Sequence, residues 1–488
     1  MSTRLEILVQ QRLEKLEKIR ASGIDPYPHL YQRTHTAQQV VALLKQDGPP
    51  REVKVSGRIT ASRPMGKAAF MNLSDGSGKI QVYVRRDHLG EQGYDLFKLL
   101  DLGDFIGLTG RPFYTHTGEP TIEAASLTVL SKALLPLPEK WHGLTDVEKR
   151  YRQRYLDLVS SDEVKGIFHT RSRIIASMRR FLDDLGFMEV ETPILQSHAG
   201  GAMAKPFTTH HNVLDRDLYL RIATELHLKR LLVGGFEKVY EIGRIFRNEG
   251  ISTKHNPEFT SMESYEAYAD YTAVMSRVEE MVAHIARSVL GTTTVEYDGR
   301  QIDFTPPWRR ITLRDAIKEQ CDIDFAEFPD APSLAAKMKE SGMAVEPGLG
   351  RGKLIDELLS TAVEHTLTQP TFLLDYPVEL SPLAKRKPGE PDLVERFEAF
   401  AGGMEIANAF TELNDPLEQR ERFKEQAKAR EAGDEEAEMP DEDFLVAMEH
   451  GMPPAGGLGV GIDRLAMLLT NQQSIREVIL FPQLKTRE

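Results

Sequence analysis

A short run of charged residues in the middle of the chain constrains its fold more than any other feature. Residues 244–263 read RIFRNEGISTKHNPEFTSME, whereas a buried strand would consist mostly of Val, Ile and Leu. Charged side chains are almost never fully buried unless they are paired, so this segment must line a cleft or a solvated face. Its cations and acids around Phe246 suit a bound triphosphate that a metal ion neutralises.

Composition indicates a globular chain of several domains. The 488 residues are 41% hydrophobic and 28% charged, and single cores stop growing at roughly 250 to 300 residues. No apolar run approaches the roughly 18 residues that cross a bilayer, and residues 1–10 lack signal-peptide architecture. The single cysteine, Cys321, cannot form an internal disulfide, so we expect a reducing, cytoplasmic location and no membrane contact. The net charge of −13 implies that any RNA is bound by local basic patches.

The first third of the sequence predicts a helical extension followed by a small barrel. Residues 1–50 form the extension, with amphipathic helical spacing over residues 4–20. Residues 51–132 contain five short strand-like runs separated by turn signals, which fits a five-stranded OB-fold barrel. The expected strands are residues 53–59, 70–73, 80–84, 105–110 and 121–130.

The rest of the chain predicts a linker and a larger α+β domain. Residues 133–160 are Pro-marked and Arg-rich, which is typical of a connector. Residues 161–488 mix helices and strands without regular alternation, which favours an antiparallel sheet flanked by helices. We expect helices over residues 171–185 and 415–448, strands over 187–190 and 192–195, and one large sheet that includes residues 219–222, 239–242, 372–375 and 397–400.

A glycine-rich block near the C-terminus is the second nucleotide-binding candidate. Residues 456–461 read GGLGVG, with glycines at every second position rather than in P-loop or dinucleotide spacing. Alone, this block is more typical of a tight strand or a packing turn. However, Asp463 and Arg464 follow at once, before the apolar helical run 465–469. A guanidinium there would stack on a planar base, while the glycines let the backbone approach the nucleotide.

These blocks together resemble one enzyme family. Residues 246–249 look like motif 2 of the class II aminoacyl-tRNA synthetases, residues 459–464 look like motif 3, and the helix and strand ending at Pro193 resemble the dimer-forming motif 1. Either motif 2 or motif 3 alone is a loose match, but their order is specific. With residues 150–158, 405–408 and 411–415, the similarity covers nearly the whole chain and is specifically to bacterial-type class II lysine–tRNA ligases.

The resemblance implies an ATP site built from both motifs. Arg247 is its catalytic residue, since joining a carboxylate to the α-phosphate needs a cation that screens two anions. Phe259 and Arg464 would sandwich the adenine, Glu249 would accept a hydrogen bond from its amino group, and His255 would face the outer phosphates. Taken singly, Phe259 also fits a core position and His255 a loop position.

Magnesium is the implied cofactor, because it accompanies ATP and takes carboxylate and phosphate oxygens. The family ligands match Glu398 and Glu405, and Glu398 also counts toward the ATP site. The two flank the turn at residues 402–403, so a hairpin would bring them together. Two surface glutamates are the alternative, but the neighbours Phe397, Phe400, Ile406 and Phe410 are apolar.

The resemblance also implies an acidic pocket for lysine. A site for an ammonium group must offer carboxylates, and a site for aspartate must offer cations. Three acids without an extra cation favour lysine. Met404 and Ala409 depart from the arginine and glycine that the family often has there, which affects fine tuning only. The matching positions are Gly201, Glu225, Glu263, Tyr265, Asn408, Phe410 and Glu412, with Arg247 on the substrate carboxylate.

For the barrel, the resemblance implies recognition of a U-rich anticodon. Single-stranded bases are bound by stacking on aromatic rings and by hydrogen bonds to their edges. Phe70 matches the stacking residue, although a strand Phe in a small barrel is commonly a core residue. Arg58, Gln81 and Glu119 are the candidates for contacts to base edges.

The expected activity is therefore the two-step attachment of L-lysine to tRNA(Lys), through a lysyl-adenylate, with release of pyrophosphate and AMP. The expected assembly is a homodimer. The alternatives are an aspartate- or asparagine-type class IIb synthetase, which the acidic pocket disfavours, and a non-catalytic RNA-binding paralogue, which the intact Arg247, Glu249, Glu398, Glu405 and Arg464 disfavour. A class I lysine enzyme would need a His-x-Gly-His signature that the sequence lacks.

Overall fold

The computed structural model describes residues 3–46, 51–138, 144–431, 433–434, 436–437 and 439–485. The chain divides into two compact units, Met1–Thr145 and Asp146–Glu488. The division lies inside the predicted linker 133–160, of which residues 139–143 are outside the described part. Among the described residues, no helix has the length and apolar character needed to cross a membrane.

The first unit is a closed five-stranded barrel, as predicted. The strands lie in the order β1-β2-β3-β5-β4. Helix α1 packs on this unit through Arg12, whose guanidinium donates hydrogen bonds to the carbonyls of Leu102, Ala133 and Leu135. The elements are α1 (Arg4–Ala21), α2 (Ala37–Leu43), β1 (Val53–Met65), β2 (Ala68–Ser74), β3 (Lys79–Arg85), α3 (Arg86–Leu99), β4 (Phe105–Tyr114) and β5 (Pro120–Ser131).

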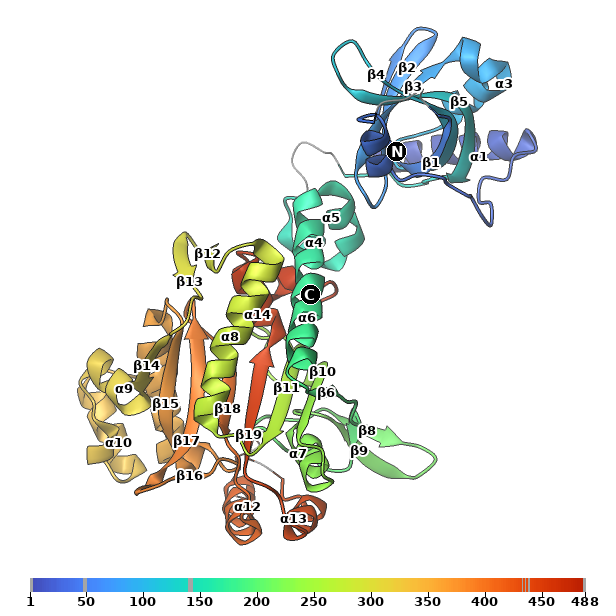
Figure 1. Ribbon diagram of the computed structural model, residues 1–488. Coiled ribbons are helices and arrows are strands. Elements are labelled where there is room, and N and C mark those ends of the chain that lie inside the picture. The colour runs from blue at the N-terminus through green and yellow to red at the C-terminus, as the bar shows by residue number, and fades with distance from the viewer. Residues whose placement is uncertain are drawn as a thin grey trace. The chain divides into compact units, whose positions relative to one another are not determined.

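The second unit is built on one large nine-stranded sheet, whose central strands lie side by side in Figure 1. The strand order is β14-β15-β17-β18-β19-β11-β10-β6, with β16 paired to β17. The two edge pairings, β14 with β15 and β10 with β6, are parallel, and the others are antiparallel. The strands are β6 (Met188–Glu189), β10 (Lys238–Phe246), β11 (Glu258–Ala267), β14 (Arg309–Thr312), β15 (Thr371–Pro377), β16 (Arg386–Lys387), β17 (Glu390–Ala401), β18 (Met404–Thr411) and β19 (Ala455–Gly461).

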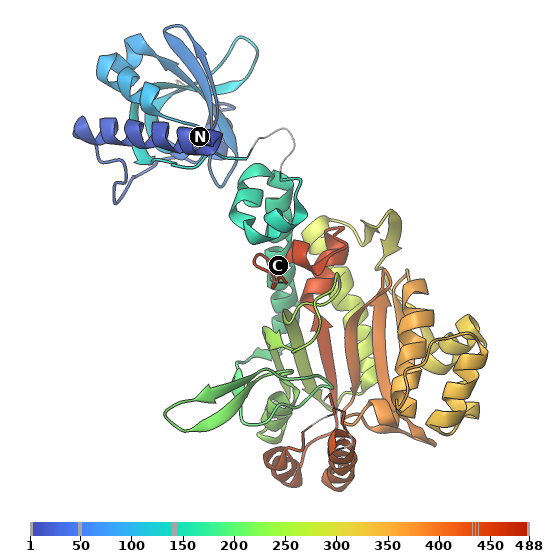
Figure 2. The ribbon, with the colours of Figure 1, turned by 180° about the vertical axis from the view of Figure 1, so that it is seen from behind.

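Three helices cover one face of this sheet and bury its main core. They are α6 (Asp162–Asp184), α8 (Tyr271–Leu290) and α14 (Ile462–Leu469), and the view from behind shows the opposite face (Figure 2). Met404 and Ala409, the two departures from the family pattern, are both buried in this core. The other helices of the unit are α4 (Val147–Arg152), α5 (Arg154–Ser160), α7 (Glu225–Val233), α9 (Leu313–Cys321), α10 (Ala331–Glu340), α11 (Arg351–Leu358), α12 (Pro416–Glu431), α13 (Glu442–Glu449) and α15 (Ile475–Val478).

Most expected elements are confirmed, but one sheet assignment was wrong, and of the strand expected over residues 192–195 only residue 195 lies in a strand. The expected strand at residues 219–222 lies outside the large sheet: β9 (Arg216–Leu220) pairs with β8 (Thr208–His211) and β7 (Leu195–Gln196) in a separate three-stranded sheet. A local hairpin joins β8 to β9, and its connection contains Asp215 at a φ of 45°. The hairpin pairs β9 with β8 rather than with a strand of the large sheet. The small strands β12 (Thr294–Tyr297) and β13 (Arg300–Asp303) form a further hairpin.

Two helices differ in length from the expectation. Helix α6 begins nine residues before the expected start at residue 171, because the Ser161 side chain accepts a hydrogen bond from Val164 N and caps it earlier. The expected helix over residues 415–448 is two helices, α12 and α13, and residues 432, 435 and 438 between them are outside the described part. Helices α4 and α5 from the predicted linker fold with the second unit.

Candidate active site

The candidate site lies on the sheet face opposite the core, where side chains from four neighbouring strands form rows. The strand register aligns Glu398, Asn408, Gly459 and Glu263 as one row from β17 to β11. The next row aligns Arg396, Phe410, Gly457 and Tyr265 in the same order. Since side chains alternate between the faces of a strand, both rows point to the same side of the sheet.

Gly457 and Gly459 of β19 each occupy one position in these rows, where they leave space above the strand. A Cβ atom at Gly457 would overlap Glu412 Oε1 and lie 2.7 Å from the Tyr265 ring. At Gly459 the nearest atom to such a Cβ is 3.7 Å away, which is ordinary van der Waals contact without overlap. The spacing of glycines at every second residue therefore makes room for neighbouring side chains and for a ligand above one strand face.

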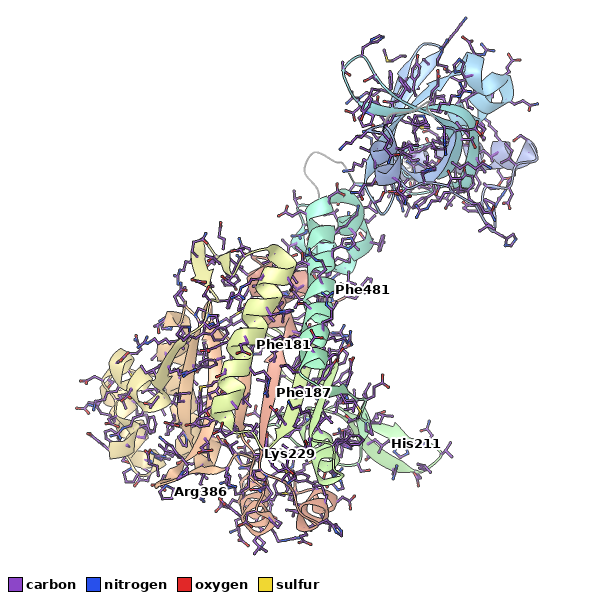
Figure 3. The ribbon with its side chains drawn as sticks, in the orientation of Figure 1. Phe181, Phe187, His211, Lys229, Arg386 and Phe481 are labelled. Carbon is purple, nitrogen blue, oxygen red and sulfur yellow. The ribbon has the colours of Figure 1, made fainter. Side chains whose placement is uncertain are left out.

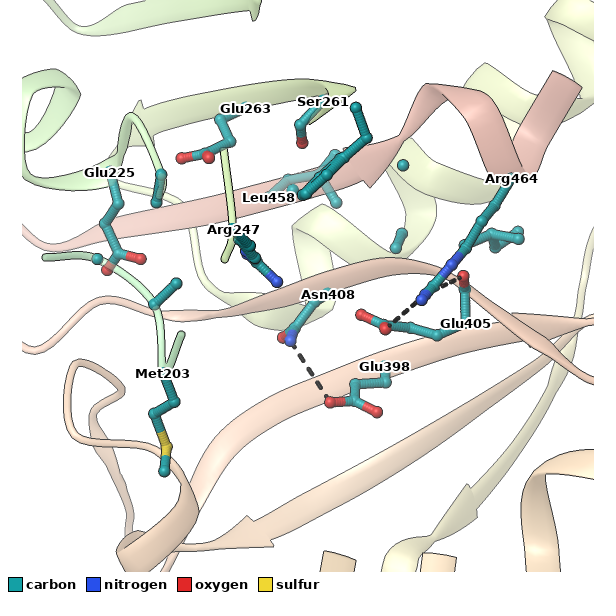
Figure 4. Close-up of a pocket in the computed structure, with 18 of the residues that line it drawn as sticks. Met203, Glu225, Arg247, Ser261, Glu263, Glu398, Glu405, Asn408, Leu458 and Arg464 are labelled. Carbon is teal, nitrogen blue, oxygen red and sulfur yellow. Dashed lines mark hydrogen bonds and ion pairs between the residues drawn. The ribbon is translucent and has the colours of Figure 1, made fainter. Parts of the chain in front are cut away.

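One cavity of about 450 Å³ gathers all fourteen site residues expected in this unit. Glu225 and Glu263 lie toward one end, Glu405 and Arg464 lie toward the other, and Arg247 lies between them (Figure 4). Their individual roles stay predictions. The residues are Gly201, Glu225, Arg247, Glu249, His255, Phe259, Glu263, Tyr265, Glu398, Glu405, Asn408, Phe410, Glu412 and Arg464.

The basic end of the cavity combines cations with an aromatic wall. Arg247 follows β10 directly, and its guanidinium carbon lies 5.3 Å from the centre of the Phe259 ring. Phe259 is half-buried at the cavity wall rather than packed in a core. Arg464 Nη1 donates to Glu405 Oε2 at 2.9 Å, and Arg464 Nη2 donates to His255 Nε2 at 3.1 Å. Burial and the neighbouring Arg464 lower the pKa of His255, which keeps its ring neutral at pH 7.

Asp463 fixes the geometry of this end. One carboxylate oxygen accepts a hydrogen bond from Arg171 Nη2 on α6 at 2.5 Å, and the other accepts from Thr260 N on β11 at 2.7 Å. Asp463 is 2% exposed and adjoins Arg464 in the first turn of α14. Asp463 therefore links α6 and β11 to the start of α14, next to Phe259 and Arg464, the two candidates for adenine binding.

Two glutamates converge where the β17–β18 hairpin closes, as the sequence predicted. Glu398 accepts a hydrogen bond from Arg396 Nη2 at 2.6 Å, and Asn408 Nδ2 lies 3.4 Å from the same oxygen (Figure 4). Burial raises the pKa of Glu398 to about 7; nearby Arg396 opposes that increase, and nearby Glu405 adds to it. The described residues contain no ready cluster of three or more metal-binding side chains. Two carboxylates beside a phosphate site suit Mg²⁺, which usually keeps waters and shares its other positions with phosphates.

The opposite end of the cavity is acidic and dry. Glu225, Glu263 and Glu412 are 6%, 9% and 0% exposed. Glu263 accepts hydrogen bonds from Thr224 N at 3.1 Å and from the Tyr265 hydroxyl at 3.2 Å. Burial, followed by repulsion from Glu225, raises the pKa of Glu263. Such a set of buried acids stabilises bound cations strongly.

The structure adds residues that the sequence reasoning missed. Arg396 stands two residues before Glu398 on the same strand face, and Lys254 adjoins His255. Their positions beside predicted site residues could have identified both as cavity residues. Lys254 Nζ donates to Gly403 O at 2.8 Å, at the turn of the β17–β18 hairpin. Asp356 of α11 also lines the cavity, without any local signal in the sequence. Lys229, four residues after Glu225 on α7, lies behind the acidic end.

In the first unit, Phe70 faces outward from the barrel. Its neighbours Ala69 and Met71 are in the barrel core, whereas Phe70 is half-buried and stacks on Tyr83 with ring centres 4.6 Å apart. Phe113 extends this surface, 6.5 Å from the Tyr83 ring. The alternative of a core phenylalanine is therefore excluded, and the outer face carries an aromatic platform.

The polar candidates on the barrel differ in position. Gln81 lies on the same strand as Tyr83 and accepts a hydrogen bond from Thr121 Oγ1 at 2.9 Å, and Glu119 is exposed before β5. Arg58 is held elsewhere: its guanidinium lies 4.2 Å from the Phe105 ring centre and donates to Gly103 O at 3.0 Å. Arg63, which the sequence reasoning missed, is exposed and pairs directly with Phe70 in the β1–β2 register.

Comparison with known proteins gives matches to both units. A family model described as tRNA synthetases class II (D, K and N) matches residues 146–485. A model described as OB-fold nucleic acid binding domain matches residues 53–130. A lysine–tRNA ligase of Dehalococcoides mccartyi strain 195 is 59% identical over 489 aligned residues, covering 99% of this chain and 98% of the relative.

Two further relatives carry the same name. The lysine–tRNA ligase of Moorella thermoacetica is 56% identical and covers 99% of this chain and 98% of its own length. That of Bacillus subtilis strain 168 is 54% identical and covers 98% of this chain and 97% of its own length. The similarity thus runs nearly end to end in both directions.

Proposed function

The chain belongs to the class II lysine–tRNA ligases, and on that premise we propose how its residues divide the work of joining lysine, ATP and tRNA. Enzymes of this family attach lysine to tRNA in two steps. The observation that carries our assignment is the union of three buried carboxylates with Arg247 and Arg464 in one cavity.

Lysine binds at the acidic end of the cavity. Its ammonium groups face Glu225, Glu263 and Glu412, with the Tyr265 hydroxyl and the Phe410 ring completing the wall. Asn408 and Arg247 contact its carboxylate, and Gly201 borders the α-amino group. An aspartate side chain would meet three buried acids, and neither aspartate nor asparagine carries a side-chain ammonium to pair with them, which disfavours the sister specificities.

ATP binds at the basic end. Phe259 and Arg464 hold the adenine between them, Glu249 accepts from its amino group, and neutral His255 contacts the outer phosphates. Glu398 and Glu405 hold Mg²⁺, whose positive charge neutralises phosphate oxygens when it is bound with the nucleotide. For Arg464 to reach the base, its contact with Glu405 must be exchanged for contacts with ligand.

The reaction begins when a carboxylate oxygen of lysine attacks the α-phosphorus of ATP. The new bond forms as the bond to the β-phosphate oxygen breaks, and pyrophosphate leaves. Arg247 stands between the two substrates, so its charge screens both anions and stabilises the transition state. In the second step, a hydroxyl of the 3′-terminal ribose of tRNA attacks the acyl carbon and loses its proton, and AMP leaves.

We propose that the aromatic platform of the barrel binds the anticodon. Replacing Phe70 by Ala is expected to weaken charging of tRNA(Lys) by roughly 10-fold or more in kcat/KM, since base stacking contributes about 1–3 kcal/mol per base. Lysine-dependent ATP–pyrophosphate exchange without tRNA should be unchanged. Tyr94→Phe supplies the control, because Tyr94 packs in the barrel and only its hydroxyl contact to Gly66 O is lost. Equal charging rates for Phe70→Ala and wild type would contradict the assignment.

Gln81 and Glu119 remain proposed contacts to base edges, and so does Arg58, whose guanidinium lies against the Phe105 ring. The exposed Arg63 supports an additional contact, because it adjoins the Phe70 ring in the register. A cytoplasmic location also stays a prediction.

We propose further that the chain forms a homodimer through motif 1. Four apolar side chains around the end of α6 and the strands after it are 38–49% exposed: Leu185, Met188, Ile194 and Leu195. Several exposed apolar side chains within one short segment are typical of a subunit interface. Met188→Glu combined with Leu195→Glu is expected to reduce the mass measured by light scattering from about twice to once the chain mass of 55.0 kDa. Leu417→Glu, at a 72% exposed site on α12, is the control, and an unchanged mass in the double variant would exclude this interface.

A further inference from the structure

Lys229 is the one described lysine that contacts the acidic end of the cavity from inside the protein. Its side chain is 0% exposed, and α7 carries it behind the cavity wall, at the position labelled in Figure 3. Its Nζ lies 2.5 Å from Glu225 Oε1 and also forms an ion pair with Glu412 Oε2. The chain therefore holds an ammonium group of its own between two acids of the proposed lysine pocket.

The surroundings of Lys229 leave its ammonium no contact with water. The Phe410 and Phe444 rings lie 5.4 and 6.0 Å from Nζ, on two sides. Burial acts to lower the pKa of Lys229, but Glu225 and Glu412 overcome this effect and raise it. An ammonium that is desolvated and doubly paired stays charged and fixed in position.

The charges at this end are matched only when Lys229 is counted. Lys229 pairs with Glu225 and Glu412, Glu225 acts on the neighbouring Glu263, and Arg247 lines the same cavity, so three carboxylates and two cations gather here. Free lysine adds two ammonium groups and one carboxylate, so the loaded pocket becomes neutral. Without Lys229, one buried carboxylate would lack a partner, which costs several kcal/mol or forces it to keep a proton.

We infer that Lys229 is a positioning residue for amino-acid selection, whose buried ammonium holds Glu225 and Glu412 ionised and oriented toward the two ammonium groups of free lysine. This inference rests on the proposed lysine pocket and goes beyond it, because Lys229 does not line the cavity and cannot touch the substrate.

The expected pH dependence follows from the groups that face this cluster. Glu225 and Lys229 come from α7, Glu263 and Tyr265 from β11, Arg396 from β17, and Glu412 follows β18. Burial raises the pKa values of Glu225 and Glu412, and Lys229 opposes both increases. Removing Lys229 raises them further, so carboxyls are protonated at neutral pH and regain their charge as the pH rises.

The test replaces Lys229 by Met and follows lysine-dependent ATP–pyrophosphate exchange between pH 7 and pH 9. At pH 7, kcat/KM for lysine is expected to fall roughly 100-fold or more, with KM for ATP unchanged. The ratio of variant to wild type should rise with pH, and taking this ratio cancels the titration of the free amino acid. A ratio that is constant with pH, or an unchanged KM for lysine, would overturn the inference.

Lys132→Met is the matched control. Lys132 is also 0% exposed and pairs with two carboxylates, Asp101 at 2.6 Å and Asp104 at 2.9 Å, but in the barrel unit. This variant loses a buried ammonium without touching the pocket, so its kcat/KM for lysine should equal that of wild type at every pH. A pH-dependent loss in Lys132→Met would show that any buried lysine produces the effect.

A second pair of variants covers the case in which Lys229→Met does not fold. Glu412→Gln combined with Lys229→Met leaves fewer unpaired charges and is compared with Glu412→Gln alone. Their ratio should still rise with pH, because Glu225 has lost its ion pair in the double variant, and a constant ratio overturns the inference. If wild-type enzyme shows no lysine-dependent exchange, the proposed pocket itself fails, whereas an active wild type with constant variant ratios contradicts Lys229 alone.

Discussion

Replacing Arg247 by Ala is expected to abolish lysine-dependent ATP–pyrophosphate exchange, with kcat lowered by roughly 10³-fold or more. Arg247 lies between the acidic and basic ends of the cavity, and its hydrogen bond from Nε to Ile222 O is long, at 3.4 Å. Its charge is therefore available to the two substrate anions. The measurement is exchange at saturating lysine and ATP, which separates loss of rate from loss of binding.

Arg244→Ala is the control for this variant. Arg244 lies on β10, three residues before Arg247; its side chain is 43% exposed and pairs with Glu258 at 3.6 Å. Its loss should leave the exchange rate unchanged, since exposed ion pairs contribute little. Near-normal exchange by Arg247→Ala would contradict the role of Arg247 in activation.

Replacing Glu412 by Gln is expected to raise KM for lysine on the order of 100-fold or more, because truncating a buried charge pair costs about 2–5 kcal/mol. Glu412 is fully buried, and Gly457 leaves the space that its carboxylate occupies. The variant keeps the shape of the side chain and removes only its negative charge. KM for ATP, whose site is at the other end of the cavity, should stay the same, as measured by exchange at varied ATP.

Glu279→Gln tests whether loss of any buried carboxylate has this effect. Glu279 is 5% exposed on α8, outside the cavity, and accepts a hydrogen bond from Trp308 N at 2.9 Å. It should lower the stability of the protein without changing KM for lysine. Equal increases of KM for lysine and ATP in Glu412→Gln would refute a separate amino-acid end.

The alternation of apolar and polar residues predicted the strands whose side chains point in turn into the core and toward solvent. The five barrel strands follow from short alternating runs between turns, and the closed barrel confirms them. Helix α3 lay unnoticed between two of these strands, because Gly90 at a φ of 72° interrupts its helical pattern. Residues 219–222 also looked like a core strand, but their pairing was decided by a nearby hairpin.

The site residues were predicted from their match to the family motifs, and the strand register explains how they come to share one cavity. Phe259, Glu263 and Tyr265 share one face of β11, and Asn408 and Phe410 share one face of β18. Arg58 and Arg63 show the limit of such prediction. Arg58 pairs with Ser74, and a register shift between Ile59 and Ala61 places Arg63 opposite Phe70, where uninterrupted pairing would place Ser62; no sequence pattern marks this shift.

Lys229 was missed for a different physical reason. A lysine on a short amphipathic helix is usually solvated, and its burial became visible only when Glu412, 183 residues away in sequence, was found on its far side. Long-range charge pairing of this kind leaves no local spacing. Glu225 lies on α7 and Glu412 follows β18, and only the fold brings both carboxylates to Lys229.

The central claim is that one cavity activates lysine because buried acids adjoin the cation that serves ATP. The most direct test is ATP–pyrophosphate exchange by the wild-type chain with each of the common amino acids in turn, with magnesium and without tRNA. The account predicts strong exchange with lysine and only background with aspartate and asparagine. Exchange that depends on aspartate or asparagine, or no exchange with lysine, would contradict it.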